Sequence, residues 1–206
     1  MIQTIFFDFG GVIIQPPNVN WVNRWKNHLR ISDHPEIIEM LENPNESQLV
    51  KDMCLGKITE DYVWVTMTQK WHINPVLLAQ IKRRLLSKRQ LNEPILKFMT
   101  ELKGRYQTAI LSNAGDKSRQ LMEETYQLHQ IVDEIIISAE EGVIKPDPRI
   151  FEIAMARMHA EPESSLLVDD FYANVMSAKA FGMQGVHFTD TQQAISEVRA
   201  MLNGRM

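Results

Sequence analysis

Cysteine is almost absent from this chain, and hydrophobic residues never gather into a long run. The single cysteine, Cys54, cannot form a disulfide within the chain, which favours a reducing compartment and a packed thiol over a nucleophile. No apolar run reaches the roughly 18 residues of a membrane-spanning helix. No basic and then apolar leader precedes the first predicted strand. We therefore expect a cytoplasmic protein without a membrane partner.

Basic residues are slightly outnumbered and form no block. The 206 residues include 22 basic and 26 acidic side chains, for a formal net charge of -4. A surface that binds nucleic acid needs a basic patch, so nucleic acid is not an expected partner. The hydrophobic content of 44% and the charged content of 23% are ordinary for a globular protein. The length allows one good-sized domain, or a domain with a modest insertion.

The most informative stretch is an apolar strand that ends in an aspartate and two glycines. Residues 5–14 read IFFDFGGVII, and the first three of them are typical of a buried strand. Functional groups of open α/β sheets gather beyond the carboxyl ends of the strands, where Asp8 stands. Gly10 and Gly11 follow it, which predicts a sharp turn with a positive φ or a close backbone approach, and N–H groups that can hold phosphate.

Further strand-like runs alternate with helical patterns along the rest of the chain. The strand-like runs are residues 107–111, 134–137, 165–168 and 185–188. The helical patterns are residues 93–103, 116–127, 148–159, 172–181 and 191–202. Such alternation predicts an α/β fold, a parallel sheet with helices on both faces.

A long insert separates the first predicted strand, residues 1–8, from the second, whereas a simple crossover needs only about 30 residues. Apolar residues at helical spacing within the insert predict an all-α cap of four or five helices. We assign residues 1–15 and 88–206 to an α/β core domain and residues 16–87 to the cap. The helical patterns are broken at Pro35, Pro44, Gly56 and Pro75. Packing is the favoured role, and lining a substrate pocket the alternative, for Trp21, Trp25, Trp64 and Trp71.

Polar residues follow the predicted strands at the edge where Asp8 stands. They are Asp8, Ser112, Asn113, Lys145, Asp169 and Asp170. Taken singly, a helix cap, a solvated lysine or an ordinary turn is the plainer interpretation of each. Together they supply a carboxylate nucleophile, a hydroxyl donor, a cation for phosphate and carboxylates for a hard metal ion. We therefore treat them as one candidate site.

Four short motifs, in order, resemble those of the haloacid dehalogenase (HAD) superfamily. They are Asp8-Phe9-Gly10-Gly11-Val12, Leu111-Ser112-Asn113, Lys145-Pro146-Asp147, and Val168-Asp169-Asp170 with Asn174. The resemblance covers the whole chain and implies a Rossmann-like core with sheet order 5-4-1-2-3 and a helical cap between the first two motifs. The first motif is most similar to that of small sugar-phosphate phosphatases of the glucose-1-phosphate type, which also have glycine at its third position.

The resemblance also implies phosphoryl transfer through an aspartyl-phosphate on Asp8, with Mg²⁺ as cofactor. The implied metal ligands are Asp8, the Gly10 carbonyl, Asp170 and Asp169, the last either as a ligand through water or as an orienting residue. Implied in phosphate binding are Phe9, Gly10, Gly11, Ser112, Asn113 and Lys145. Lys145 and Ser112 would also be catalytic. The expected partner is a small phosphorylated substrate, with a sugar phosphate favoured, and the expected protein is a monomer or homodimer.

One position departs from the family's usual pattern. Most of its phosphatases carry a second aspartate two residues after the nucleophile as general acid/base, and here Gly10 stands there. Proton transfer by a positioned group typically contributes about 10²–10⁴-fold. Either another group, such as His28, replaces it, or the substrate has a good leaving group, as in a sugar 1-phosphate, an aryl phosphate or an acyl phosphate. We therefore hypothesise a modest turnover and a longer-lived phosphoenzyme.

Two other functions stay open. A metal-independent 2-haloacid dehalogenase also uses an aspartate nucleophile and lacks the second aspartate. Without a cation, however, the adjacent Asp169 and Asp170 would repel a haloacid anion. The second alternative is a non-catalytic member that binds a metabolite or a protein, which Gly10 leaves open.

Overall fold

A parallel sheet forms the centre of the computed structural model, which describes residues 1–15, 35–69, 72, 74–86 and 90–204. Its strands are β1 (Thr4–Phe7), β2 (Gln107–Ser112), β3 (Glu134–Ile137), β4 (Ser165–Asp169) and β5 (Gln184–His187). Their order is β3-β2-β1-β4-β5, which is the order that the family resemblance implied. The predicted α/β fold with a parallel sheet is therefore confirmed.

The first strand lies at the centre of the sheet and is buried on both faces. Phe7 pairs with Ile110 of β2 on one side and with Val168 of β4 on the other. Phe6 belongs to one hydrophobic core cluster, whereas its neighbours Ile5 and Phe7 belong to another. Successive side chains of a strand point to opposite faces, so an uninterrupted apolar run suits a strand that is covered on both.

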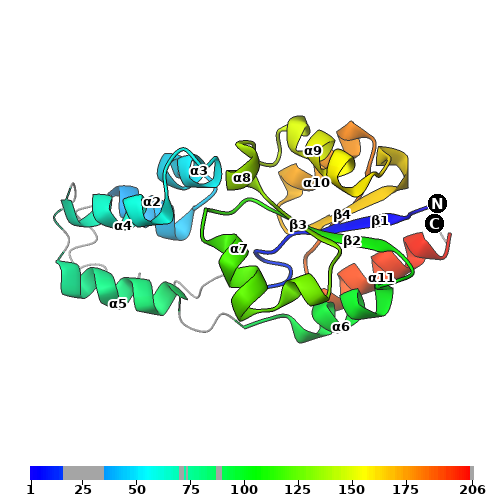
Figure 1. Cartoon of the computed structure of the whole chain (residues 1–206), viewed down its shortest axis with the longest axis horizontal. Helices are drawn as coiled ribbons and strands as arrows, with labels where there is room; N and C mark the ends of the chain where they lie inside the picture. Colours follow the sequence, from blue (N-terminus) through cyan, green and yellow to red (C-terminus); the bar gives the residue numbers. More distant parts are fainter. Residues whose placement is uncertain (16–34, 70–71, 73, 87–89, 205–206) are drawn as a thin grey trace.

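Pairs of helices cover the two faces of the sheet (Figure 1). On one face, α6 contacts α11, and on the other α9 contacts α10. These helices are α6 (Glu93–Leu102), α9 (Pro148–Met158), α10 (Tyr172–Phe181) and α11 (Thr191–Leu202). Three of them begin at a capping side chain that accepts a backbone N–H, namely Asn92, Asp147 and Asp190. Such local signals explain why their predicted boundaries agree with the structure to within a residue.

The helical pattern predicted over residues 116–127 is confirmed only in part. The chain there forms a short helix, α7 (Ser118–Gln120), and then a π-helical turn over Leu121–Thr125. Over a single turn, the spacing of apolar residues barely distinguishes these helix types, so the pattern could not separate them. A further short helix, α8 (Ser138–Glu141), follows β3 directly and ends at Gly142, whose φ is 69°.

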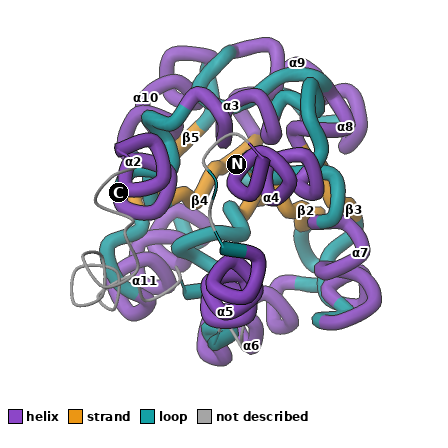
Figure 2. The backbone as a smooth tube through the Cα atoms, turned by 90° about the vertical axis from the view of Figure 1, so that its left-hand side faces the viewer, coloured by secondary structure: helices purple, strands orange, loops and turns teal. Residues whose placement is uncertain are grey.

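Apart from α6, the helices described between β1 and β2 lie beyond the end of the sheet opposite the N-terminus, which is the end where the parallel strands finish (Figures 1 and 2). They are α2 (Pro35–Glu42), α3 (Gln48–Cys54), α4 (Glu60–Gln69) and α5 (Pro75–Leu86), and we call them the helical segment. Pro35 and Pro75 begin helices, because the fixed φ of proline suits a first turn. Across the described residues, none of the helices is long and apolar enough to span a bilayer.

Close backbone contacts hold α3 against the core. The hydroxyl of Ser138 donates a hydrogen bond of 2.6 Å to the carbonyl of Cys54, the last residue of α3. Gly56, with a φ of 68°, passes so near α8 that a Cβ there would lie 2.2 Å from the Ala139 carbonyl oxygen. The turn after α3 therefore requires glycine, and the helical segment is placed over the carboxyl ends of the strands.

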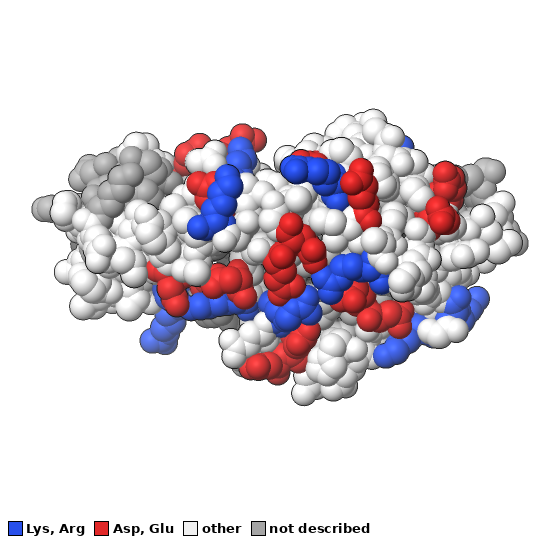
Figure 3. Space-filling model, turned by 45° about the horizontal axis from the view of Figure 1, so that its top comes forward, with Lys and Arg blue, Asp and Glu red and all other residues white. Residues whose placement is uncertain are grey.

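Charged side chains of both signs are interspersed on the face drawn in Figure 3. Arg119 bridges Glu123 and Glu140 at 2.7 and 2.6 Å, and Arg157 lies 3.0 Å from Glu134. Exposed pairs of this kind each contribute about 0–1 kcal/mol to stability. The main effect of these ion pairs is that positive and negative charges on the surface partly neutralise each other.

Candidate active site

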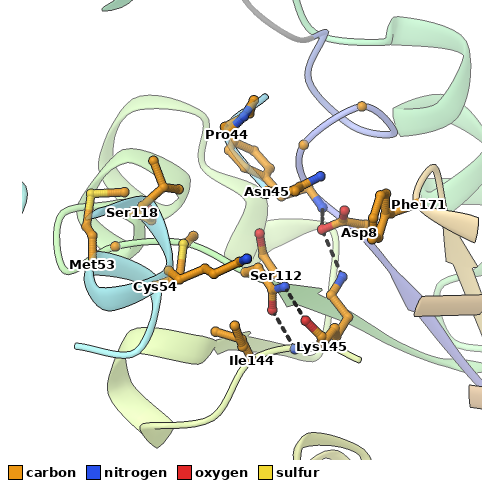
Figure 4. A pocket seen from close by; sticks show the side chains of 18 of the residues that line it. Asp8, Pro44, Asn45, Met53, Cys54, Ser112, Ser118, Ile144, Lys145 and Phe171 are labelled. Atoms are coloured by element: carbon orange, nitrogen blue, oxygen red, sulfur yellow. Dashed lines mark hydrogen bonds and ion pairs between the residues drawn. The ribbon is translucent and has the colours of Figure 1, made fainter. Parts of the chain in front are cut away.

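The structure brings the predicted carboxylates together at the carboxyl edge of the sheet. Asp8 follows β1, Asp169 ends the neighbouring β4, and Asp170 comes next. One oxygen of each lies within 4.8 Å of the others, and we call these three residues the acidic cluster. Lys145, from the loop after α8, places its Nζ 3.1 Å from Asp8 Oδ1 and 2.6 Å from Asp169 Oδ2. Figure 4 shows the lysine reaching Asp8.

Burial governs the charges of this site. It raises the pKa of Asp8 to about 7, an effect that the charges of Asp169 and Asp170 increase and that of Lys145 opposes. For Lys145, burial lowers the pKa, but the charges of Asp169 and Asp8 outweigh it and hold the pKa above its usual value. Burial and the charge of Asp169 also raise the pKa of Asp170. Three carboxylates around one buried ammonium carry an excess of negative charge, which a divalent cation would offset.

Asp169 is held from several sides. Its Oδ2 accepts a hydrogen bond from Lys145, and its Oδ1 accepts one from the Phe171 N–H over 2.8 Å. The side-chain amide of Asn174 donates to both oxygens, over 3.0 and 3.1 Å. Within the described residues, Asn174 Oδ1 has no hydrogen-bond partner. Because both oxygens of Asp169 are already used, this carboxylate fits the orienting role better than that of a metal ligand.

Asn113 fixes the loop that carries Lys145. Its Nδ2 donates to the Lys145 carbonyl and its Oδ1 accepts from the Lys145 N–H, each over 2.8 Å. The ammonium of Lys145 also donates to the carbonyl of Leu111 over 2.6 Å. The sequence placed Asn113 in the site only as an implied phosphate-binding residue. Sequence reasoning missed this pairing because no local signal links residues 32 positions apart.

The glycine turn after Asp8 is only partly as predicted. Gly11 has a φ of 77°, and a Cβ there would lie 1.9 Å from Asp170 Oδ2, so the positive φ and the close approach are both confirmed. Its N–H donates to the Ile14 carbonyl over 2.8 Å. The Phe9 N–H likewise donates to Asp8 Oδ1 over 2.7 Å. Both N–H groups are thus bonded within the turn in this structure, and phosphate binding by Phe9 and Gly11 stays a prediction.

A cavity of about 510 Å³ opens in front of Asp8, between the core and the helical segment. Besides Asp8, the predicted site residues that line it are Phe9, Gly10, Gly11, Ser112, Asn113, Lys145 and Asp170. Trp64 lines it too, against the expectation of core packing, and its indole N–H donates to Glu60 over 3.1 Å. The other candidates named from the sequence lie outside the described residues, namely Trp21, Trp25, His28 and Trp71.

Comparison with known protein sequences gives a consistent family. A family model described as haloacid dehalogenase-like hydrolase matches residues 2–182. The mouse bifunctional epoxide hydrolase 2 is 30% identical over 126 residues, which are 59% of this chain and 23% of that protein. The chain thus spans less than a quarter of that relative's length.

Other relatives match along nearly their whole length. A sesquiterpene phosphatase of Aspergillus oryzae is 30% identical over 201 residues, covering 97% of this chain and 96% of the relative. A D-ribitol-5-phosphate phosphatase of Bacteroides thetaiotaomicron is 24% identical over 201 residues, covering 89% and 90%.

Solved structures share the fold. A HAD-like hydrolase from Porphyromonas gingivalis has a TM-score of 0.78 and 22% identity, with 98% of both chains covered. A HAD family enzyme of Bacteroides thetaiotaomicron, in complex with magnesium and inorganic phosphate, has a TM-score of 0.73 and 19% identity, with 90% of this chain and 93% of that chain covered. Since the family model covers most of the chain and the Aspergillus relative is 30% identical along it, this chain belongs to the haloacid dehalogenase-like hydrolases.

Proposed function

We propose that this protein is a magnesium-dependent phosphatase that hydrolyses a small phosphorylated metabolite through an aspartyl-phosphate on Asp8. The observation that carries the proposal is the surroundings of Asp8, which lies 3.1 Å from the buried Lys145 ammonium, within the acidic cluster, and on the wall of a cavity. A carboxylate that attacks an anionic phosphate needs positive charge beside it, and this site is built to hold such charge.

The donor set fits Mg²⁺, which prefers carboxylate and carbonyl oxygens and keeps several waters. Asp8, Asp170 and the Gly10 carbonyl would hold the ion, and Asp169 would orient Lys145 beside it. When bound, the ion offsets negative charge and acts as a Lewis acid on the phosphate. The magnesium and phosphate complex of the Bacteroides thetaiotaomicron enzyme, which shares the fold, supports this assignment.

Asp8, Lys145 and Ser112 would act directly on the phosphate. An Asp8 carboxylate oxygen attacks phosphorus in line, and the P–O bond of the ester breaks with its electron pair on the departing oxygen, which takes a proton from water and leaves as the alcohol. The Lys145 ammonium, held between Asp8 and Asp169, neutralises charge on the transferring group, and the Ser112 hydroxyl donates to one of its oxygens. Water then hydrolyses the aspartyl-phosphate, which releases phosphate and restores the Asp8 carboxylate.

Gly10 supplies no carboxylate to protonate the leaving group, so esters with good leaving groups should react faster in this site. A sugar phosphate is the class that the first motif suggested, and the D-ribitol-5-phosphate phosphatase relative supports it. The sesquiterpene phosphatase relative supports a different class of organic group.

A division into two parts completes the proposal, with residues 1–15 and 88–206 as the α/β core domain and residues 16–87 as a helical cap domain. In support, every described strand lies within residues 4–7 or 107–187, and the helical segment lies within residues 35–86. Because the cavity lies between these parts, the core would supply the chemistry and the cap the choice of substrate.

Phosphate release from p-nitrophenyl phosphate with Mg²⁺ tests the function. We expect activity that a chelator removes, and a loss of at least about 10³-fold in Asp8→Asn, since the nucleophile is lost. Asp52→Asn is the matched control, because this aspartate of α3 does not line the cavity. A fully active Asp8→Asn, or activity that survives chelation, contradicts the proposal.

A second assay, of chloride release from a 2-haloacid, separates the two alternatives. Chloride release from a 2-haloacid without metal, and no phosphate release, would indicate a dehalogenase. Inactivity towards both substrates would indicate a binding protein.

A further inference from the structure

The cavity in front of the acidic cluster has two chemically different ends. The acidic cluster, Lys145 and Ser112 form the polar end. Away from them, the described wall is mainly apolar, and it is formed by the helical segment on one side and the core on the other. The apolar side chains that carry the argument are Met40, Val50, Met53, Val63, Trp64 and Leu121.

Five polar side chains lie on this wall within the described residues, and two of them each make a hydrogen bond within the protein. Glu60 accepts the indole N–H of Trp64 over 3.1 Å, and Lys51 Nζ donates to the Glu46 carbonyl over 3.2 Å. The other polar side chains away from the acidic cluster are Gln15, Asn45 and Ser118. A hydroxyl that is buried without a partner weakens binding by about 5- to 150-fold. Because the apolar side chains that make up most of the wall offer a hydroxyl no partner, the wall suits an organic group that carries no hydroxyls.

Met53 marks the place where α3 approaches the loop after β2. A Cβ on Gly115 would lie 3.0 Å from Met53 Cγ and 3.2 Å from its sulfur. The Met53 side chain lies across the cavity from Asp8 (Figure 4). Because a thioether chain adapts to apolar groups of different shape, Met53 is placed to contact the far part of a group whose phosphate is at Asp8.

We propose that the ester hydrolysed at this site carries an apolar organic group, a hydrocarbon chain or aromatic ring without hydroxyls, which lies against Met53 and the other apolar side chains while its phosphate meets Asp8. The proposal rests on the phosphatase function above and departs from the sugar phosphate that the first motif suggested. The cavity, at about 510 Å³, is within the range of about 300–1,000 Å³ that is usual for small organic ligands.

A series of primary alkyl phosphates tests the proposal with leaving groups of nearly equal basicity. With Mg²⁺ present, kcat/KM for methyl, propyl, pentyl and heptyl phosphate should rise by about fourfold for each methylene until the cavity is filled. D-ribitol 5-phosphate has the same number of carbon atoms as pentyl phosphate but adds hydroxyls. We expect pentyl phosphate to be preferred over it by at least about tenfold. A flat series, or an equal or better rate with D-ribitol 5-phosphate, overturns the proposal.

Met53→Gln locates the effect. It keeps the length of the side chain and adds an amide, so the heptyl-to-methyl ratio of kcat/KM should fall by about tenfold. Met176→Gln is the matched control, since Met176 is 44% exposed on α10 and does not line the cavity. Val50→Thr, nearly isosteric, repeats the test if Met53→Gln does not fold. A ratio that stays at the control value in both cavity variants contradicts the assignment.

The outcomes separate this inference from the function on which it rests. Phosphate release from p-nitrophenyl and methyl phosphates with a flat alkyl series would overturn only the apolar group. No Mg²⁺-dependent phosphate release from any of these esters would overturn both.

Discussion

Replacing Lys145 with methionine removes the ammonium that lies 3.1 Å from Asp8 and 2.6 Å from Asp169. The side chains of Lys145, Asp169 and Asp8 are 1%, 0% and 13% exposed, so water would compensate little for the loss. At an effective dielectric constant of about 20, unit charges roughly 3 Å apart attract by about 5 kcal/mol, part of which offsets their desolvation. Removing one partner of a buried pair typically costs about 3–5 kcal/mol. We expect Lys145→Met to lower the free energy of unfolding by about that amount.

Asp169→Asn identifies the cause of that loss. The amide nearly keeps the size of the side chain and removes the charge, so the double variant should be at least about 2 kcal/mol more stable than the sum of the single losses predicts. Urea unfolding followed by circular dichroism, with a chelator present, measures the four proteins of the cycle. Lys97→Met, at an exposed position of α6, is the control and should stay within about 0.5 kcal/mol. Additive losses, or a Lys145→Met no less stable than the control, would refute the reasoning.

Two further predictions concern the backbone and the thiol. Gly11→Ala should lower the free energy of unfolding by at least about 1 kcal/mol, because Gly11 has a φ of 77° and an added Cβ would meet Asp170. Gly10→Ala should change the free energy of unfolding by less than about 0.5 kcal/mol, because the space around its Cβ is open. Equal shifts in Tm for the two variants would contradict this. Burial, with a contribution from Asp8, raises the pKa of the Cys54 thiol from 9.0 to about 12. At pH 8 its alkylation by iodoacetamide should therefore be about 10³-fold slower in the folded protein than in urea, and similar rates would disprove it.

Local sequence patterns were enough to predict the elements of the core and the edge of the sheet at which the chemistry lies. Apolar runs predicted the strands, since a strand buried on both faces must be apolar on both. Capping residues such as Asn92 and Asp190 predicted where helices begin. Because the carboxyl ends of parallel strands share one edge, the sequence alone predicts that Asp8, Asp169 and Asp170 lie together.

How those residues are held, and what lies opposite them, depends on the packing of elements that are far apart in the sequence. The Asn113 bonds to Lys145 and the Asn174 bonds to Asp169 depend on loops packed side by side, which no periodicity reports. The hydrogen bond from the Gly11 N–H to the Ile14 carbonyl depends on the path of the turn that joins them. The apolar wall opposite Asp8 arises because α2, α3 and α4 pack across the strand ends, and the contact of Met53 with the loop at Gly115 brings together residues far apart in the chain. Sequence patterns encode local geometry, whereas such contacts are set by the packing of whole elements.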